Sequence, residues 1–372
     1  MTDAAGTVYY LIPDIYEPKF TLRGTLSALR RGRIRGYAQT HIWPKAKPVG
    51  GIKVMYQHCL ELRAAGIRAE LVSTGVYTGN YFDYPITPIP LNELGFDLKP
   101  QDVVVAPEIR PYLGLEFKQA HKVMFAQNSI LMYDNKWNPA DLGKSFVELG
   151  YDSVMTCSEH LRTELNREPA AAVTLVNNFI DHRQFCPAPE RRNDGLVMAL
   201  PRKNPQDLEA IRRACPGIQF NLVDNVSQAE MVQQYQCSDV FLATGYPEGF
   251  GLPPLEAMAC GAAVVGFTGG AAAEYMIHNE TALVVPDGDT AGAASELRRL
   301  LSDGALRERL RLAGLTQSQI YTADRVRQQL VQKFAPLTRT TPASAPRASA
   351  APKDATPAEP AASSEVPSAR FG

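Results

Sequence analysis

Short runs of apolar and β-branched residues alternate with longer helical patterns along most of the chain, and this alternation restricts the fold more than any other feature. The runs predicted as strands are 7–13, 68–73, 102–108, 122–128, 153–158, 172–178, 195–201, 218–224, 240–246, 262–267 and 281–286. Helical patterns such as IKVMYQHCLELRAAG lie between them. Strands that alternate with helices form βαβ units, so the sequence predicts an α/β fold with parallel sheets covered on both faces.

The strand runs fall into two sets, separated by a stretch at 180–194 that is rich in proline and charge. We therefore predict two facing, doubly wound Rossmann-like domains, 1–185 and 186–334, the second ending in a helix at about 321–334. Ligands of such folds bind in the crevice beyond the carboxyl ends of the strands. Residues 335–372 are mostly Pro, Ala, Ser and Thr, and we predict a disordered tail because they cannot bury enough apolar area to offset their ordering entropy.

Composition excludes several classes of protein. The net charge is -1, with 38 Lys and Arg against 39 Asp and Glu, which argues against a protein that coats nucleic acid. No run approaches the roughly 20 apolar residues that span a bilayer, and the N-terminus lacks the basic region of a secretion signal. The 6 cysteines form no CxxC pair, so a zinc ribbon is not expected. These features predict a reduced, cytoplasmic protein.

Two familiar nucleotide-binding motifs are absent. A GxGxxG fingerprint does not follow the first predicted strand, which counts against a hydride-transferring oxidoreductase. The sequence Gly143-Lys144-Ser145 is similar to the end of a phosphate-binding P-loop, but Asn138 and Pro139 stand where that loop begins with glycine. We interpret it as an ordinary turn before a helix.

The most informative stretch is PEGFGLPPLEAMACG at 247–261, directly after the predicted strand at 240–246. Its two early glycines allow the backbone to approach a ligand closely, and its two prolines suit the first turn of a helix. Glu256 is expected in that first turn and Glu248 in the loop before it. Both carboxylates then reach one crevice beside a helix N-terminus, where free N–H groups attract anions such as phosphate.

Each carboxylate also has a simpler interpretation. Glu256 would complement the helix dipole, which is worth about 0.3–1 kcal/mol, and Glu248 would be a solvated loop acid. No Ser or Thr stands three residues before Glu256 to complete a capping box, because that position is Pro253. Taken together with the glycines and prolines, the two acids favour a functional site.

This spacing, Glu248-x7-Glu256, resembles the signature of the retaining GT-B glycosyltransferases of family 4, the glycosyl transferases group 1. The resemblance continues through AAVVGF, GGAAAE, HNETALVVPDGD and YTADRVRQQLVQKF, and it is strong over 170–334. It implies that the last helix, at about 321–334, crosses back to the first domain. It implies that Glu248 holds the hydroxyls of the donor sugar. It also implies that the backbone amides of Gly249, Phe250 and Gly251 orient that sugar and that Glu256 binds the ribose of the nucleotide.

Arg202 and Lys203 follow the predicted strand at 195–201 and match the basic pair that, in this family, neutralises the departing diphosphate. An Arg–Lys pair at a strand end supplies the charge stabilisation that a leaving dianion requires, although a solvated turn is the alternative. Gly50 and Gly51 match the glycine-rich loop of the family near the donor phosphates and the acceptor.

Other positions on the first domain are interpreted mainly as structural. Ser158 is expected to be a helix N-cap. Glu108 either lines the acceptor side or is a structural residue at a strand end. The chain has Gln127 where many members place a histidine that contacts the sugar, and His121 precedes the strand and is not expected to replace it.

Two further departures from the family concern loops. The spacing from Gly269-Gly270 to Glu274 is one residue longer than usual, which leaves phosphate contacts from this loop open. The segment 21–50 carries seven Lys or Arg residues and no acid. Attraction of 23–47 to an anionic membrane surface or to a lipid-linked pyrophosphate acceptor, and a solvated loop, are equally supported interpretations.

The resemblance therefore implies a retaining, hexosyltransferase-type enzyme that transfers a sugar from a nucleoside-diphosphate donor to an acceptor hydroxyl in polysaccharide or glycolipid biosynthesis. The expected partners are the nucleotide sugar, as co-substrate, and a glycan or lipid-linked acceptor. We expect no nucleic acid, metal or cofactor, and a cytoplasmic location with peripheral contact to the inner membrane if 23–47 binds lipid. A sugar-nucleotide epimerase or hydrolase on the same fold, and a non-catalytic nucleotide-sugar-binding protein, remain alternatives.

Overall fold

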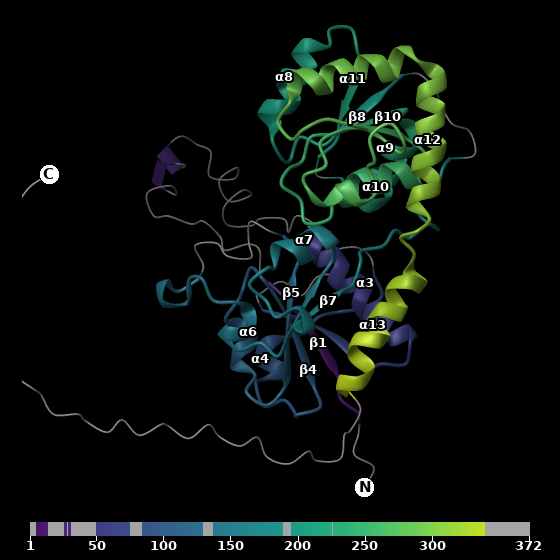
Figure 1. The fold of residues 1–372 in the computed structure, drawn as a ribbon. Helices are drawn as coiled ribbons and strands as arrows, with labels where there is room; N and C mark the ends of the chain where they lie inside the picture. The colour runs from purple at the N-terminus through teal and green to yellow at the C-terminus, as the bar shows by residue number, and fades with distance from the viewer. Residues whose placement is uncertain are drawn as a thin grey trace, which may run out of the picture. The chain divides into compact units, whose positions relative to one another are not determined.

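The computed structural model describes residues 5–13, 26–27, 29–30, 50–74, 84–128, 137–188, 195–224 and 226–338. Their strands form two parallel sheets, each covered by helices (Figure 1). The predicted α/β fold with two parallel sheets is thereby confirmed. None of the helices among these residues is long and apolar enough to cross a membrane.

The first sheet has seven parallel strands in the order β3-β2-β1-β4-β5-β6-β7. The strands are β1 (Val8–Ile12), β2 (Ala69–Ser73), β3 (Ile89–Pro90), β4 (Val103–Pro107), β5 (His121–Ala126), β6 (Ser153–Thr156) and β7 (Val173–Leu175). All five residues of β4 are buried, as expected for a central parallel strand. The sequence did not predict β3, because two residues that end in proline at a sheet edge leave no apolar run to recognise.

The second sheet has five parallel strands in the order β12-β11-β10-β8-β9. They are β8 (Val197–Ala199), β9 (Phe220–Leu222), β10 (Val240–Ala243), β11 (Ala263–Gly266) and β12 (Leu283–Val284). In the centre, Val240 on β10 stands opposite Val197 on β8 and Ala263 on β11. The strand order reverses between β8 and β10, so the loops after these two strands diverge to opposite faces of the sheet and leave a crevice.

Helices cover the faces of both sheets, as Figure 1 shows. Their bounds are α3 (Gly50–Ala64), α4 (Leu91–Leu94), α6 (Phe146–Leu149), α7 (Glu159–Glu164), α8 (Pro205–Ala214), α9 (Gln228–Cys237), α10 (Leu252–Ala259), α11 (Thr290–Ser302), α12 (Gly304–Ser318) and α13 (Ala323–Thr338). Two of the helices matter most for the site, because α3 follows β1 and α10 follows β10, each leading away from the carboxyl edge of its sheet.

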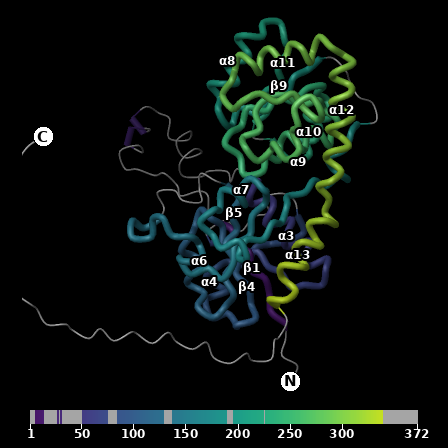
Figure 2. Tube along the Cα trace, viewed as in Figure 1, coloured from purple at the N-terminus to yellow at the C-terminus, as the bar shows by residue number. Residues whose placement is uncertain are grey.

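The last helix, α13, packs against the first sheet region. Figure 2 shows α13 running back alongside α3. The Phe334 ring lies 6.2 Å from the Tyr10 ring of β1, and Arg327 pairs with Glu61 of α3 at 2.7 Å. The predicted end at 334 is too early, since α13 continues to Thr338. The carbonyl of Thr338 accepts a 2.8 Å hydrogen bond from the backbone of Gly6, and this contact holds the final turn in place.

The domain division at residue 185 stays a prediction. The strands of the two sheets do fall on either side of that boundary, but Met1–Thr340 packs as one compact unit. Residues 339–372, which include nearly all of the predicted tail, lie outside the described residues. So does the basic segment 23–47, apart from 26–27 and 29–30.

One half-buried lysine of α13 makes stability depend on pH. The Nζ of Lys333 donates a 2.8 Å hydrogen bond to Ser153 Oγ, and burial lowers the pKa of Lys333 from its usual 10.5 to about 8. Below pH 8 the lysine is charged in both states, and its burial opposes folding by a constant amount. Between pH 8 and 10.5 the unfolded chain binds more protons, so this residue makes the free energy of unfolding rise with pH.

We therefore expect the variant Lys333→Met to be more stable than the parent below pH 8, with an advantage that shrinks as the pH approaches 10.5. Comparing the two proteins removes the contributions of other titrating groups, which both share. Urea unfolding of parent and variant at pH 7, 8.5 and 10 measures this difference. A difference that is the same at all three pH values would contradict the lowered pKa.

Candidate functional site: a cleft at the carboxyl edges of both sheets

A cavity of about 520 Å³ lies where the carboxyl edges of the two sheets meet. Pro13 and Glu108, which follow the adjacent strands β1 and β4, line it from the first sheet. Leu200 and Thr244, which follow the adjacent strands β8 and β10, line it from the second. Each pair flanks the point where the strand order of its sheet reverses, which is where open α/β sheets bind ligands.

The loop from Glu248 to Gly251 is held from several directions. The N–H of Glu248 donates to the carbonyl of Gly269 at 2.8 Å, and the carbonyl of Gly249 accepts from Ser158 Oγ at 2.7 Å. The Tyr275 hydroxyl donates to the carbonyl of Gly251. Among the described residues, no group accepts a hydrogen bond from the N–H of Gly249, Phe250 or Gly251. The three predicted donor-binding amides therefore remain available to a ligand in the cavity.

The side chain of Phe250 is buried and packs against other aromatic rings. The ring is 3% exposed and packs 5.8 Å from the Tyr275 ring and 5.5 Å from the Tyr321 ring. Tyr321 lies just before α13, so this aromatic cluster anchors the loop beside the crossover to the first sheet. Because its ring is buried in this cluster, Phe250 can contact a ligand only through its backbone amide.

Helix α10 begins one residue earlier than its prolines suggest. Gly251 is the N-cap with φ of +80°, a conformation that favours glycine, and Leu252 is the first helical residue. Pro253 and Pro254 occupy the first turn, where a missing N–H costs nothing. The sequence-based placement of Glu256 in the first turn is consequently wrong, since it is the fifth residue of the helix.

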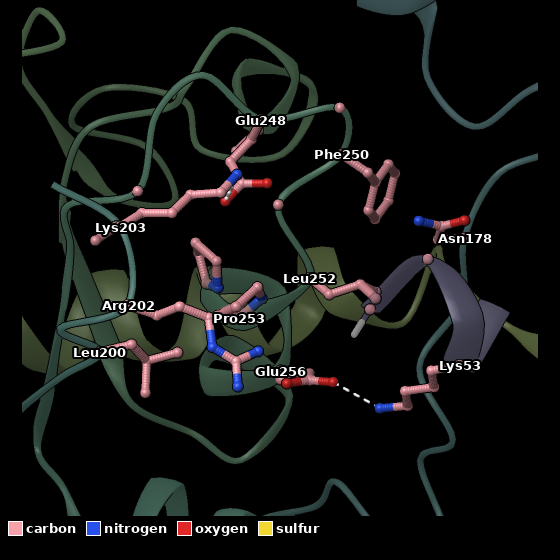
Figure 3. Close-up of a pocket in the computed structure, with 18 of the residues that line it drawn as sticks. Lys53, Asn178, Leu200, Arg202, Lys203, Glu248, Phe250, Leu252, Pro253 and Glu256 are labelled. Atoms are coloured by element: carbon pink, nitrogen blue, oxygen red, sulfur yellow. Dashed lines mark hydrogen bonds and ion pairs between the residues drawn. The ribbon is translucent and has the colours of Figure 1, made fainter. Parts of the chain in front are cut away.

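Glu256 is buried and bound at both oxygens. Its Oε1 lies 2.8 Å from Lys53 Nζ of α3, and its Oε2 accepts a 3.1 Å hydrogen bond from the Tyr235 hydroxyl of α9 (Figure 3). Burial and the charge of Glu256 together raise the pKa of Tyr235, which keeps that hydroxyl a donor. The predicted ribose-binding carboxylate is thus already held by one residue from each sheet region.

Glu248 forms a second acid–base pair in the cleft. Its Oε1 lies 2.8 Å from Lys203 Nζ, which also donates to the carbonyl of Pro247 at 3.0 Å. Figure 3 shows these two side chains together on the side of the cavity away from Glu256. Arg202 lies 3.8 Å from Asp224 and is about half exposed. The Glu248 side chain is 25% exposed, so water and ligands reach this pair.

The turn that carries Arg202 and Lys203 is fixed to the loop after β10. Asn204 adopts a left-handed conformation with φ of 49°, and its Oδ1 accepts from the N–H of Tyr246 at 3.0 Å. The Tyr246 hydroxyl donates to Asp207 at 2.6 Å. These contacts explain why a pair of residues after β8 reaches Glu248 after β10.

From the first sheet region come Gly50 and Gly51, which are the first two residues of α3 and not a loop before it. Both line the cavity. A Cβ on Gly50 would meet Leu252 Cδ1 at 3.6 Å, and one on Gly51 would meet Gln127 Nε2 at 3.2 Å. The N-terminus of α3 therefore comes close to the start of α10, and Gln127 lies in the cavity wall.

Of the other positions named in the sequence analysis, Glu108 lines the cavity, and the others make contacts that hold the fold together. Ser158 is the N-cap of α7, as predicted, and Glu108 is 4% exposed in the cavity wall. His121 starts β5 and lies 3.3 Å from Ser153 Oγ, at the opposite end of the strand from the cavity. Glu274 accepts from the N–H of His160 at 3.2 Å and so anchors α7. Burial raises the pKa of Glu274.

Sequence reasoning missed Lys53, Tyr235, Asn178 and Thr244 among the residues that line the cavity. Lys53 offered one signal, a lone charge inside the otherwise apolar start of a helix. Asn178 and Thr244 are 4% and 2% exposed, and within the described residues Asn178 Oδ1 and Thr244 Oγ1 have no hydrogen-bond partner. Buried polar atoms of this kind suit a ligand that supplies the missing hydrogen bonds.

Comparison with known families places residues 208–316, from α8 to α12, in the glycosyl transferases group 1. N-acetyl-alpha-D-glucosaminyl L-malate synthase of Bacillus anthracis is 37% identical over 79 residues, which are 21% of each chain. D-inositol 3-phosphate glycosyltransferase of Corynebacterium diphtheriae is 32% identical over 93 residues, 25% of this chain and 22% of the relative. The chain thus covers about a fifth of the length of these two relatives.

Solved structures extend the similarity to nearly the whole chain. Sucrose-phosphate synthase of Thermosynechococcus elongatus gives a TM-score of 0.64 at 16% identity, over 89% of this chain and 99% of the other. A glycosyltransferase of Rickettsia africae gives 0.61 at 12% identity, over 91% and 100%. Anabaena HepE in complex with UDP-glucose gives 0.59 at 13% identity, over 89% and 99%. The chain has the GT-B fold of glycosyltransferases, and its residues 208–316 belong to the glycosyl transferases group 1 family.

Proposed function

We propose that the chain is a retaining glycosyltransferase that transfers a sugar from a nucleoside-diphosphate donor to an acceptor hydroxyl, in polysaccharide or glycolipid biosynthesis. The observation that carries this proposal is the convergence of two carboxylates, Glu248 and Glu256, with three cations in one cavity. The cations are Lys53, Arg202 and Lys203. HepE, which shares the fold, is solved in complex with UDP-glucose, and that complex supports a nucleotide-sugar ligand for this chain.

The proposed arrangement of the donor follows the distribution of charge. The diphosphate lies beside Arg202 and Lys203 at the N-terminus of α10, where N–H dipoles and cations favour an anion, and the amides of Gly249–Gly251 orient the sugar. The ribose lies at Glu256, deeper in the cavity. The sugar lies at Glu248, whose carboxylate accepts hydrogen bonds from sugar hydroxyls.

The proposed chemistry is front-face attack. The glycosidic bond to the β-phosphate breaks, the acceptor oxygen bonds to the anomeric carbon on the same face, and the acceptor proton passes to a leaving phosphate oxygen. Negative charge grows on the diphosphate as this bond breaks, so cations that are fixed beforehand stabilise the transition state more than the ground state. The residues named here act by positioning and by charge.

Nucleotide binding gives the direct test. The protein is melted with UDP, GDP, ADP and dTDP, each well above its expected dissociation constant. A ligand at ~100 times its Kd adds about 2.7 kcal/mol to the free energy of unfolding, which raises the melting temperature measurably. We expect a shift with the diphosphate of one base and a smaller shift with its monophosphate. No shift with any of the four nucleotides would contradict the proposed site.

Incubation with donor alone separates the alternatives. The nucleotide sugar of the base that stabilises the protein is incubated with enzyme, with and without a mixture of candidate glycan acceptors. A transferase releases nucleoside diphosphate mainly when acceptor is present. Equal release without acceptor indicates a hydrolase, and a changed sugar without release indicates an epimerase. Binding without any turnover indicates the non-catalytic alternative.

A further inference from the structure

Lys53 occupies a position where a lysine is costly. It lies in the first turns of α3 and is 8% exposed, with its Nζ 4.6 Å from the centre of the Phe185 ring. A buried ammonium group destabilises a protein unless a counter-charge and hydrogen bonds compensate. The counter-charge is Glu256, which lies 203 residues later in the chain on α10 of the second sheet. The pair therefore joins the two sheet regions inside the cavity.

The two hydrogen bonds to Glu256 fix the orientation of its carboxylate. Lys53 donates to Oε1 and Tyr235 donates to Oε2, and the two donors come from α3 and α9. With one donor on each oxygen, rotation of the carboxylate would break both bonds. An ionised carboxylate offers about four lone-pair sites, so each oxygen keeps capacity for one more donor. Glu256, Lys53 and Tyr235 all line the cavity.

We propose that Lys53 is a positioning residue of the nucleotide site, an inference that rests on the proposed function. Lys53 holds the Glu256 carboxylate in one orientation, so that its remaining lone pairs accept hydrogen bonds from the two ribose hydroxyls. The site then favours ribonucleoside diphosphates over 2′-deoxyribonucleoside diphosphates. Because Lys53 belongs to the first sheet region, this discrimination requires both regions, although the nucleotide itself lies against the second.

A purely structural role for the pair makes a different prediction. If Lys53 only ties the two sheet regions together, its loss weakens the binding of every nucleotide by the same factor. If Lys53 aims the carboxylate, its loss weakens the binding of ribonucleotides more than that of 2′-deoxyribonucleotides. The ratio of the two dissociation constants therefore separates positioning from general stabilisation.

The experiment measures dissociation constants by calorimetry for UDP, GDP and ADP and for their 2′-deoxy counterparts, with the full chain. For a base that binds, we expect the parent to favour the ribonucleotide roughly tenfold or more, because hydrogen bonds to a charged group are strong. In Lys53→Met we expect this preference to fall below about threefold. Lys53→Arg, which keeps a charged donor, is expected to restore part of the preference.

Lys203→Met is the control within the site. Lys203 also pairs with a carboxylate at 2.8 Å, but that carboxylate is Glu248 on the sugar side. This variant is expected to weaken the binding of ribo- and deoxyribonucleotides by the same factor, so the ratio of their dissociation constants stays unchanged. Lys122→Met removes an ion pair at 3.3 Å with Asp152 outside the cavity and is expected to change neither affinity.

Leaving Glu256 buried without a polar neighbour threatens folding, so Lys53→Gln is made in parallel, because it keeps a polar side chain there but is one bond too short to keep the 2.8 Å contact to Glu256. The inference is overturned if folded Lys53→Met, or Lys53→Gln when the methionine variant does not fold, retains the preference of the parent. It is also overturned if the parent binds nucleotides but does not distinguish ribose from deoxyribose. If the parent binds no nucleotide at all, the proposed function itself fails and this inference fails with it.

Discussion

Glu248→Gln is expected to lower the turnover number roughly 100- to 1,000-fold, the loss seen when one preorganised electrostatic contact to a transition state is removed. The carboxylate accepts hydrogen bonds from the sugar in our proposal and holds Lys203 at 2.8 Å beside the leaving phosphate. Glutamine keeps the shape but loses the charge, so both functions weaken. The dissociation constant of the free nucleoside diphosphate should stay within about threefold, because that ligand lacks the sugar.

The measurement is nucleotide release under saturating donor and acceptor, together with calorimetry for the nucleoside diphosphate. Glu248 is partly exposed, so the loss of its ion pair should cost only about 0–1 kcal/mol of stability. Glu209→Gln is the matched control, because Glu209 pairs with Arg212 at 2.9 Å on the outer face of α8. If the Glu248 variant turned over like this control, Glu248 would have no role in the chemistry.

The strands of both sheets were predictable because a parallel strand buried on two faces must be a short apolar run. Each predicted run overlaps one observed strand, and the observed strands are shorter by one to four residues. Predicted strand residues that lie beyond the observed strand ends, such as Leu200 and Thr244, line the cavity. An apolar pattern does not distinguish the end of a strand from the loop that follows it, since Thr244 is buried and Leu200 partly buried although both lie beyond their strands.

The pairing of residues within the site was less predictable. The motif placed Glu248 and Glu256 at one cavity, and the strand ends placed Lys203 near them. The Lys53–Glu256 pair joins residues 203 positions apart, and no local pattern encodes such a contact. Its only trace in the sequence is a charge in the apolar first turns of α3, which is equally typical of a solvated helix face. Packing between the two sheet regions decided this contact.

The second large effect is expected at Gly249, which packs against the backbone of Gln127 in the first sheet region. A Cβ on this residue would lie 1.7 Å from the carbonyl oxygen of Gln127, which belongs to backbone that cannot move aside alone. Gly249→Ala therefore forces the loop after β10 away from the first sheet region. That shift breaks the 2.7 Å bond from Ser158 Oγ to the carbonyl of Gly249 and displaces Glu248 next to it.

We expect Gly249→Ala to lose turnover roughly 100-fold or more, since a displacement of about 1 Å in a catalytic site has this cost. Overpacking should also lower the free energy of unfolding by about 1–3 kcal/mol. Gly50→Ala is the control inside the cavity, where the new Cβ meets only Leu252 at 3.6 Å. Gly304→Ala is the control outside it, with no atom within 4 Å.

The measurements are the turnover number and the free energy of unfolding in urea for the three alanine variants. Gly304→Ala should be as active as the parent and no less stable, because alanine favours a helix over glycine by up to about 1 kcal/mol. Gly50→Ala should keep its stability, and any loss of turnover from its place in the cavity should be far smaller than that of Gly249→Ala, because its new Cβ displaces no backbone. A Gly249→Ala protein that remained active would show that the loop carrying Glu248 works without its contact to Gln127. The catalytic geometry would then belong to the second sheet region alone, and the first region would serve the acceptor only.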